Sequence, residues 1–204
     1  MRDLNTRDHI VESADRLFYV RGYDHTSFAD IAAAVNISRG NFYYHFKTKD
    51  EILEAVIDAR MVRTGAMLER WELETPAPAE RIRRFIRMMI DNRADIKLYG
   101  CPVGTLTTEM AKLDHAARRD SGRLFTLFRA WLRTQFHALG CGASADRLAM
   151  HLLARSQGIA TLASAFRDER FIRQEAALLE EWLAGVIEDH AGGRKRGAAR
   201  RKIQ

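Results

Sequence analysis

The chain has 204 residues, and its hydrophobic fraction of 47% is enough for one large domain or for a small domain joined to a larger one. It holds only 3 Pro and 13 Gly and has no Asn-Gly or Asp-Gly turn, which argues against a turn-rich all-β protein. The net charge is +6, but residues 191–204 alone supply that excess. The rest of the chain is formally neutral, so the overall charge does not by itself predict a nucleic-acid partner.

The sequence carries no sign of a targeting or membrane segment. Residues 1–5 lack the apolar core of a signal peptide, and no run of about 18 residues is both apolar and free of charge. The two cysteines are too few for a disulfide framework and fit a reducing compartment. We therefore expect a cytoplasmic protein with no membrane partner.

Apolar residues at helical spacing predict three helices at the start of the chain, over residues 6–21, 28–35 and 38–46. Gly22 is placed to end the first helix, because glycine readily adopts the left-handed backbone of a helix end. Asn36 interrupts the second apolar stripe, and asparagine tolerates the same conformation. Two short helices joined by a tight turn and preceded by a supporting helix are typical of a helix-turn-helix.

The rest of the chain is also predicted to be helical. A fourth helix begins at a capping box formed by Thr48 and Glu51. The helices expected from here on cover residues 48–71, 79–98, 105–113, 116–139, 144–166 and 170–189. The fold is therefore expected to be all-α, with about nine helices.

Three regions follow from this pattern. They are a helix-turn-helix domain over residues 1–48, a larger helical domain over residues 49–190, and a basic tail over residues 191–204. The tail is expected to be disordered, because Gly192 and Gly193 introduce a run of basic residues without apolar side chains to bury.

In a helix-turn-helix, the second helix enters the major groove of DNA with its N-terminal residues at the base edges. Here Phe42 and Phe46 form its apolar stripe and are expected to pack inward. Arg39 can pair with guanine and Asn41 with adenine, and Gly40 would let the backbone approach the groove closely.

Local charge supports the same assignment. Residues 37–49 hold three basic residues and no acid, although residues 1–50 as a whole hold seven basic and seven acidic side chains. The start of the fourth helix would offer backbone N–H groups to a phosphate. The alternative interpretation is that Tyr43, Tyr44 and His45 are partly buried aromatic residues of an ordinary helix.

The N-terminal segment resembles the TetR family of regulators over about residues 7–56. The motifs that carry the resemblance are Arg21-Gly22-Tyr23, Thr26-Ser27-Phe28-Ala29-Asp30-Ile31-Ala32, Asn36-Ile37-Ser38 and Asn41-Phe42-Tyr43-Tyr44-His45-Phe46-Lys47-Thr48-Lys49-Asp50-Glu51. The last of these is highly specific to the family. Asn36 stands where the family usually has Gly, a small departure because Asn is the next-best left-handed residue.

The resemblance implies a homodimer that binds palindromic, double-stranded operator DNA through the second and third helices. It also implies that residues 1–48 are the DNA-binding domain and residues 49–190 the ligand-binding and dimerisation domain. The positions that match the family's phosphate contacts are held by Thr26, Tyr43, His45 and Lys49. Those that match its groove contacts are held by Arg39, Gly40, Asn41 and Tyr44. Together with the cap and the flanking lysine, the residues expected at the DNA are Thr26, Ser38, Arg39, Gly40, Asn41, Tyr43, Tyr44, His45, Lys47 and Lys49.

Aromatic and Met residues recur at helical spacing in the larger domain, a pattern more typical of a core than of a pocket. A cavity between helices is nevertheless the usual small-molecule site of a helical fold, and the resemblance implies an effector there. The residues expected to bind or sense it are Met88, Met89, Cys101, Phe125, Phe128 and Trp131. We expect a repressor that a small molecule releases from DNA, without a cofactor or a metal.

The helix expected over residues 144–166 is apolar nearly all round, so neighbours must cover all of its sides. The resemblance implies a four-helix bundle at the dimer interface, built from the last two helices of each chain. The residues expected in it are Leu152, Ile159, Leu162, Phe166, Leu179, Trp182 and Val186.

Cys101 leaves an alternative open. Its setting, Gly100-Cys101-Pro102, resembles a subset of the family in which some members, such as N-ethylmaleimide-reductase-type repressors, sense electrophiles through that thiol. The other interpretation is a small side chain that fits a tight junction between helices.

Two further classes of protein remain as rivals. Cys101 and a histidine such as His115 would suit a nucleophilic enzyme, but no oxyanion motif, phosphate loop or metal-ligand spacing accompanies them. We therefore expect no enzyme. A helical lipid- or partner-binding protein with a vestigial helix-turn-helix is the second rival, and it would not retain DNA in a gel-shift experiment.

Overall fold

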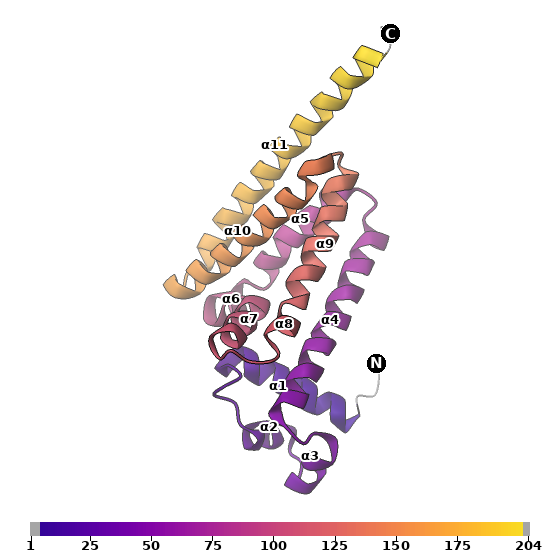
Figure 1. Ribbon diagram of the computed structural model, residues 1–204. Coiled ribbons are helices and arrows are strands. Elements are labelled where there is room, and N and C mark those ends of the chain that lie inside the picture. Colours follow the sequence, from indigo (N-terminus) through magenta and orange to yellow (C-terminus); the bar gives the residue numbers. More distant parts are fainter. Residues whose placement is uncertain (1–4, 202–204) are drawn as a thin grey trace. The chain divides into compact units, whose positions relative to one another are not determined.

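The computed structural model describes residues 5–201, and every regular element in that range is helical (Figure 1). The elements are α1 (Thr6–Arg21), α2 (Phe28–Val35), α3 (Arg39–His45), α4 (Lys49–Glu74), α5 (Pro78–Asp91), α6 (Arg93–Tyr99), α7 (Pro102–Lys112), α8 (Arg118–Ser121), α9 (Arg123–Ala138), the 3-10 turn η1 (Gly142–Ser144), α10 (Ala145–Phe166) and α11 (Glu169–Arg201). The predicted all-α fold is confirmed.

Two of the expected helices are each divided in the structure. The helix predicted over residues 79–98 is broken at Asn92, which separates α5 from α6 with φ −95° and ψ 10°. The helix predicted over residues 116–139 begins as the short α8 and continues as α9 after Gly122. When these pairs are counted as single helices, the described part of the chain has the nine that were predicted.

The first compact unit comprises residues 1–66 and 101–124. One hydrophobic cluster forms its core, and α1 to α4 supply most of it, including the fully buried Ile10, Ile31 and Ile52. From α7, Leu106 and Met110 complete the cluster with 5% and 0% exposure. The unit thus differs from the predicted domain over residues 1–48, because the N-terminal helices bury part of their apolar surface against α7.

The second compact unit comprises residues 67–100 together with the chain from residue 125 onward. Within it α10 and α11 run side by side, α11 also packs against α5, and α10 packs against α6 (Figure 1). The core side chains of α5, α9 and α10 include Ile86, Phe136 and Leu152, all at 0% exposure. Within the described residues, every helix is too short or too polar to span a lipid bilayer.

The last helix is longer than the sequence analysis predicted. It was expected to end near Asp189 and to be followed by a disordered tail, but α11 continues to Arg201. The structure thus extends α11 beyond its expected end, while the disorder expected over residues 191–204 stays a prediction, and residues 202–204 lie outside the described part. The physical reason is helix propensity, because Ala, Arg and Lys are among the strongest helix formers and outweigh the glycines in this run.

Candidate nucleic-acid interface

The turn between α2 and α3 is set by residues whose backbone and side chains both favour it. Ser27 caps α2 in a capping box with Asp30: the Asp30 N–H donates to the Ser27 hydroxyl at 3.2 Å, and the Ser27 N–H donates to the Asp30 carboxylate at 2.8 Å. These hydrogen bonds from Ser27 lower the pKa of Asp30. Asn36 ends α2 with φ 56° and ψ 46°, which confirms its predicted left-handed conformation. Ser38 then caps α3, accepting the Asn41 N–H at 3.3 Å.

The inner face of α3 is fixed by aromatic packing. Phe42 and Phe46 are each 1% exposed, as their spacing predicted. The ring of Phe28 in α2 meets Phe42 edge to face at 5.1 Å and stacks on Tyr43 at 5.5 Å. These contacts hold α3 at one rotation about its axis, so the residues between the two buried Phe side chains must face outward.

The outer face of α3 gathers the residues that were predicted to contact the groove. Asn41 is exposed, and Tyr44 is 78% exposed with its ring against that of His45 at 5.1 Å. A Cβ atom placed on Gly40 would meet nothing within 4 Å. Arg39 is the first residue of α3, beside these residues in the chain. This face therefore offers side chains and an uncovered stretch of backbone to a partner.

Two lysines border that face where α3 leads into α4. The Lys47 ammonium donates to the carbonyl of Tyr43, and the Lys47 backbone N–H donates to the Glu51 carboxylate at 2.7 Å. One half of the predicted capping box is confirmed, since the Thr48 hydroxyl accepts the Glu51 N–H at 3.1 Å, while the Glu51 carboxylate accepts from Lys47 instead of Thr48. The Lys49 ammonium donates to the Tyr23 carbonyl at 3.0 Å and lies 4.2 Å from the centre of the Tyr23 ring.

Thr26 is the one predicted phosphate contact that the structure contradicts. Its side chain is 1% exposed, and its hydroxyl donates to the Gly22 carbonyl at 2.7 Å. The prediction is wrong because this hydroxyl closes the loop between α1 and α2. Thr26 shapes that loop and does not present its side chain to a partner.

A hydrogen-bonded hub that no sequence pattern predicted surrounds Tyr23, which is 5% exposed, while its carboxylate residue Asp50 lies at the surface. The Tyr23 hydroxyl donates to the Asp50 carboxylate, and the His115 Nε2 lies 3.3 Å from the same oxygen. The hydrogen bond from Tyr23 and then the one from His115 lower the pKa of Asp50. Burial, reinforced by the Asp50 carboxylate, raises the pKa of Tyr23 well above its ordinary value. The hub therefore fixes the backbone that Lys49 contacts.

His115 has both ring nitrogens engaged within this hub. Its Nδ1 accepts the Ala117 N–H at 3.0 Å, so in the neutral ring the proton lies on Nε2, toward Asp50. A general base needs a free nitrogen within reach of the nucleophile. His115 is thus a structural residue of the hub, and it is not arranged to activate Cys101.

Helix α7 is tied to the helix-turn-helix at both of its ends. Near its C-terminus, the Glu109 carboxylate accepts the backbone N–H groups of Tyr23 and Asp24, each at 2.9 Å. At its N-terminus, the Pro102 carbonyl accepts a hydrogen bond of 2.6 Å from Arg60, a side chain that also bonds Asp15 of α1 at 2.7 Å. A displacement of α7 is therefore expected to reach the loop that carries Tyr23.

Cys101 caps α7 and is partly buried. Its sulfur accepts the Gly104 N–H at 3.5 Å, and Gly100 before it has φ 78°. The predicted junction between helices is confirmed.

The other residues predicted to bind an effector lie in the second unit. Phe128 of α9 is 7% exposed and packs edge to face on Phe85 of α5 at 5.5 Å. Trp131, one turn further along α9, meets Trp71 of α4 at 5.8 Å. Met89 is buried, while Met88 and Phe125 are partly exposed.

The predicted dimer residues divide into two groups. Leu152, Ile159 and Leu179 are 0%, 3% and 1% exposed within a single chain, so they belong to its own core and cannot meet a partner. Leu162 and Phe166 are 44% and 72% exposed. Trp182 and Val186 are partly buried, and Trp182 packs against Phe136 and His151 of the same chain. On α10, which is apolar on all sides, the sequence gave no signal to separate buried from exposed side chains.

Two family models match the chain. Residues 10–56 match the model described as "Bacterial regulatory proteins, tetR family". Residues 78–177 match "Transcriptional regulator LmrA/YxaF-like, C-terminal domain". The first match contains the whole helix-turn-helix, and the second begins in α5 and ends in α11.

Individual relatives agree with these models. An uncharacterised HTH-type transcriptional regulator of Lactococcus lactis is 28% identical over 86% of this chain and 92% of its own length. The HTH-type transcriptional repressor DhaR of a Mycobacterium species is 26% identical over 62% of each chain. Among solved structures, a TetR transcriptional regulator of Legionella pneumophila has a TM-score of 0.79 and 25% identity, covering 89% of this chain and 98% of that one.

Proposed function

The chain belongs to the TetR family of bacterial DNA-binding transcription regulators, and from that premise we propose that it is a repressor. It binds a palindromic operator as a homodimer in the bacterial cytoplasm, and it leaves the operator when a small molecule binds within its helical body. The similar DhaR is itself a repressor, which supports this mode of action.

The observation that carries the proposal is the division of α3 into a locked face and a free face. The side chains of Phe42 and Phe46 are buried on one face. On the other face Tyr44 is exposed and no atom lies close to Gly40. In a helix-turn-helix this free face is the one that enters the major groove.

Within this proposal the residues of α3 and its flanks have separate roles. Arg39, Asn41 and Tyr44 contact base edges, and Gly40 allows the backbone to approach them. The residues that contact phosphates are Ser38, Tyr43, His45, Lys47 and Lys49. Phosphate contacts position the protein, whereas base contacts determine which sequence it prefers.

The two roles predict different effects of substitution. Tyr44→Ala is expected to weaken binding to the preferred sequence by about 10-fold and to blur the preference for that sequence. Lys49→Ala is expected to weaken binding to all duplexes and to reduce the slope of log affinity against log salt by about one. Fluorescence anisotropy with a preferred and a scrambled duplex, at several salt concentrations, measures both effects.

Lys112→Ala is the control, because Lys112 is an exposed lysine of the same unit, at the end of α7 and away from α3 in the sequence. It is expected to leave the salt slope unchanged. If the Tyr44 and Lys49 variants both bind as tightly as the wild type, the free face of α3 does not contact DNA.

Gly40→Ala is expected to change stability and DNA affinity in opposite directions. The new methyl group meets nothing in the protein, and Ala is the better helix former, so unfolding should become more costly by about 0.5 kcal/mol. On DNA the same methyl group meets the groove, and affinity should fall about 10-fold, as for one mismatched base pair. Thermal denaturation measures the expected gain in stability, and anisotropy measures the expected loss of DNA affinity. An unchanged affinity would show that Gly40 does not lie at the DNA interface.

We infer that α10 and α11 form the dimer interface through their exposed apolar side chains. These are Met150, Leu162, Phe166 and Leu178, with exposures of 44%, 44%, 72% and 49%. Apolar side chains of this size on two adjacent helices favour burial against a second copy of the chain.

The thiol of Cys101 offers a second mode of release, and the structure favours a capping role instead. Because serine is a better N-cap than cysteine, Cys101→Ser is expected to keep the stability of α7 and to bind DNA within about twofold of the wild type. Anisotropy before and after treatment with N-ethylmaleimide compares the two chains. Release of DNA from the wild type alone would identify Cys101 as a sensor and reverse this assignment.

A further inference from the structure

The indole N–H of Trp131 is buried without a hydrogen-bond partner in the described part of the chain. The side chain is only 8% exposed, so the group cannot be satisfied by bulk water. Indole offers a donor and no acceptor, and nearly all buried donors in proteins are paired. An orphan donor in the middle of a helix of the second unit therefore calls for an acceptor from outside the chain.

The polar groups beside Trp131 do not supply that acceptor, because they are engaged with each other. One turn along α9, the buried Gln135 donates to the Glu72 carboxylate at 3.1 Å and accepts from Arg81 at 3.2 Å. The Arg81 guanidinium also donates to the carbonyls of Thr75 at 2.6 Å and Glu72 at 3.0 Å. None of these hydrogen bonds involves Trp131.

Trp131 meets the ring of Trp71, and one turn before it on α9 Phe128 meets the ring of Phe85. Trp71, Phe85, Phe128 and Trp131 form what we term the aromatic cluster, with ring pairs at 5.8 Å and 5.5 Å. Trp71 is partly exposed, so the cluster reaches the surface of the unit at α4. Such rings favour a flat apolar compound, and the Trp131 N–H is the buried donor that they leave unpaired.

We propose that the effector is an uncharged aromatic compound whose oxygen acceptor receives the Trp131 Nε1–H within the aromatic cluster. This inference rests on the proposed ligand-responsive function and names the chemistry of its ligand. An uncharged compound is favoured because the charged groups bonded to the neighbouring Gln135, Glu72 and Arg81, are already satisfied through Gln135 and backbone carbonyls. A charged ligand would have to be buried without a counter-ion.

Two probes of nearly equal shape test the acceptor. In 2-acetylnaphthalene a carbonyl stands where 2-ethylnaphthalene has a methylene group. Calorimetry on the full chain is expected to show about 10-fold tighter binding of the ketone, the scale of one hydrogen bond made to an otherwise unpaired donor. In 15N-labelled protein, the ketone and not the hydrocarbon should move the indole N–H resonance of Trp131 downfield.

Matched variants separate the donor from the ring. Trp131→Phe keeps an aromatic side chain without the N–H, so it should lose the preference for the ketone while still binding the hydrocarbon. Continued binding of the hydrocarbon also shows that the variant is folded. Trp182→Phe is the control, because Trp182 lies on α11 against Phe136 and His151, outside the aromatic cluster. It should keep the preference intact.

Equal affinity of the wild type for both probes, an unmoved Trp131 resonance, or no binding of the ketone would each overturn the inference. A gel shift on the same protein distinguishes a failure of the effector inference from a failure of the proposed function. A chain that binds operator DNA but shows one of these results contradicts only the effector chemistry. A chain that binds no DNA contradicts the proposed function itself.

Discussion

Arg60→Met is expected to lower the free energy of unfolding of the protein by about 3 kcal/mol, because it breaks a largely buried ion pair and leaves Asp15 paired only with the exposed Arg63. The Arg60 side chain is 9% exposed, and that of Asp15 is 17% exposed. The substitution also removes the donor to the Pro102 carbonyl at the start of α7. Chemical denaturation at one fixed protein concentration measures the change, since self-association would otherwise alter the apparent stability.

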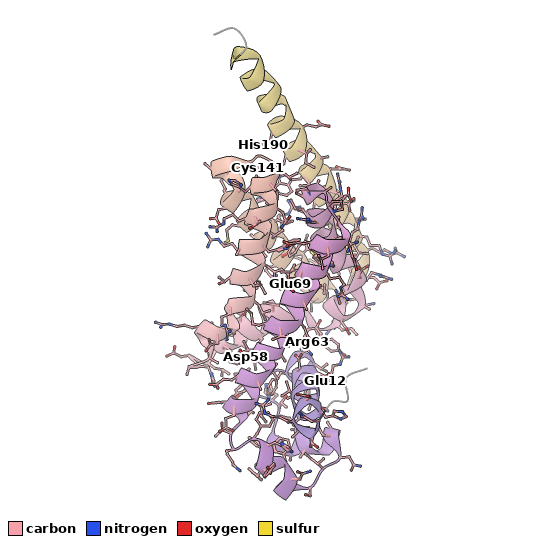
Figure 2. All side chains as sticks on the ribbon, turned by 90° about the vertical axis from the view of Figure 1, so that its right-hand side faces the viewer. Glu12, Asp58, Arg63, Glu69, Cys141 and His190 are labelled. Atoms are coloured by element: carbon pink, nitrogen blue, oxygen red, sulfur yellow. The ribbon has the colours of Figure 1, made fainter. Side chains whose placement is uncertain are left out.

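Arg63→Met is the matched control for that experiment. Arg63 also comes from α4, as Figure 2 shows. It pairs with the same Asp15 carboxylate, but its side chain is 52% exposed. Exposed ion pairs contribute about 1 kcal/mol or less, so this variant should be nearly as stable as the wild type. If the two variants lose the same stability, burial does not explain the role of Arg60, and α7 is not anchored through it.

Phe166→Asp is expected to convert the dimer into monomers and to abolish tight operator binding. Phe166 is 72% exposed in the single chain, so the substitution should leave the fold of the monomer intact. In the dimer it would bury an unpaired carboxylate, and self-association should weaken by at least about 100-fold. A monomer contacts only one half-site of a palindrome, so it loses the affinity that two linked half-sites provide. Analytical ultracentrifugation and a gel shift measure the two losses.

Leu73→Asp is the control for that interface, because Leu73 is 87% exposed but lies on α4. It is expected to remain dimeric and to bind DNA like the wild type. A Phe166→Asp chain that stays dimeric at micromolar concentration would move the interface away from the end of α10.

The sequence predicted the positions of most helices because local signals mark their ends. Gly22, with φ 88°, and Asn36, with φ 56°, adopt the left-handed backbone that their residue types favour. Ser38 and Thr48 cap the helices that they precede. The break at Asn92 was not predicted, because no Gly or Pro marks it and the apolar pattern continues across it. The end of α11 was missed because glycine was given more weight than the helix formers around it.

The candidate site was predictable only in part, for a physical reason. Residues of α3 lie next to each other in the sequence, so one motif identifies them. The hub around Tyr23 is different, because Glu109 and His115 lie 86 and 92 residues away along the chain. No local pattern brings such residues together. The buried hydroxyl of Thr26 likewise depends on how its loop closes and not on its residue type.

The sequence also could not predict which side chains of α10 are buried. Ile159 and Leu162 are both apolar and three positions apart, yet the first is 3% exposed and the second is 44% exposed. When a helix is apolar on all sides, its periodicity does not reveal which side faces its own chain and which side faces a partner. Only the packing of α5, α6 and α11 around α10 separates the two.

Selection of bound duplexes from a random pool, followed by sequencing, tests the central claim most directly. If the free face of α3 reads DNA in a dimer, the wild-type protein should enrich one motif made of two inverted half-sites, with their centres about one helical turn or more apart. The Tyr44→Ala chain, selected in parallel, should enrich the same motif less sharply. A wild-type pool that stays random, or that yields a single motif without an inverted repeat, would contradict the account.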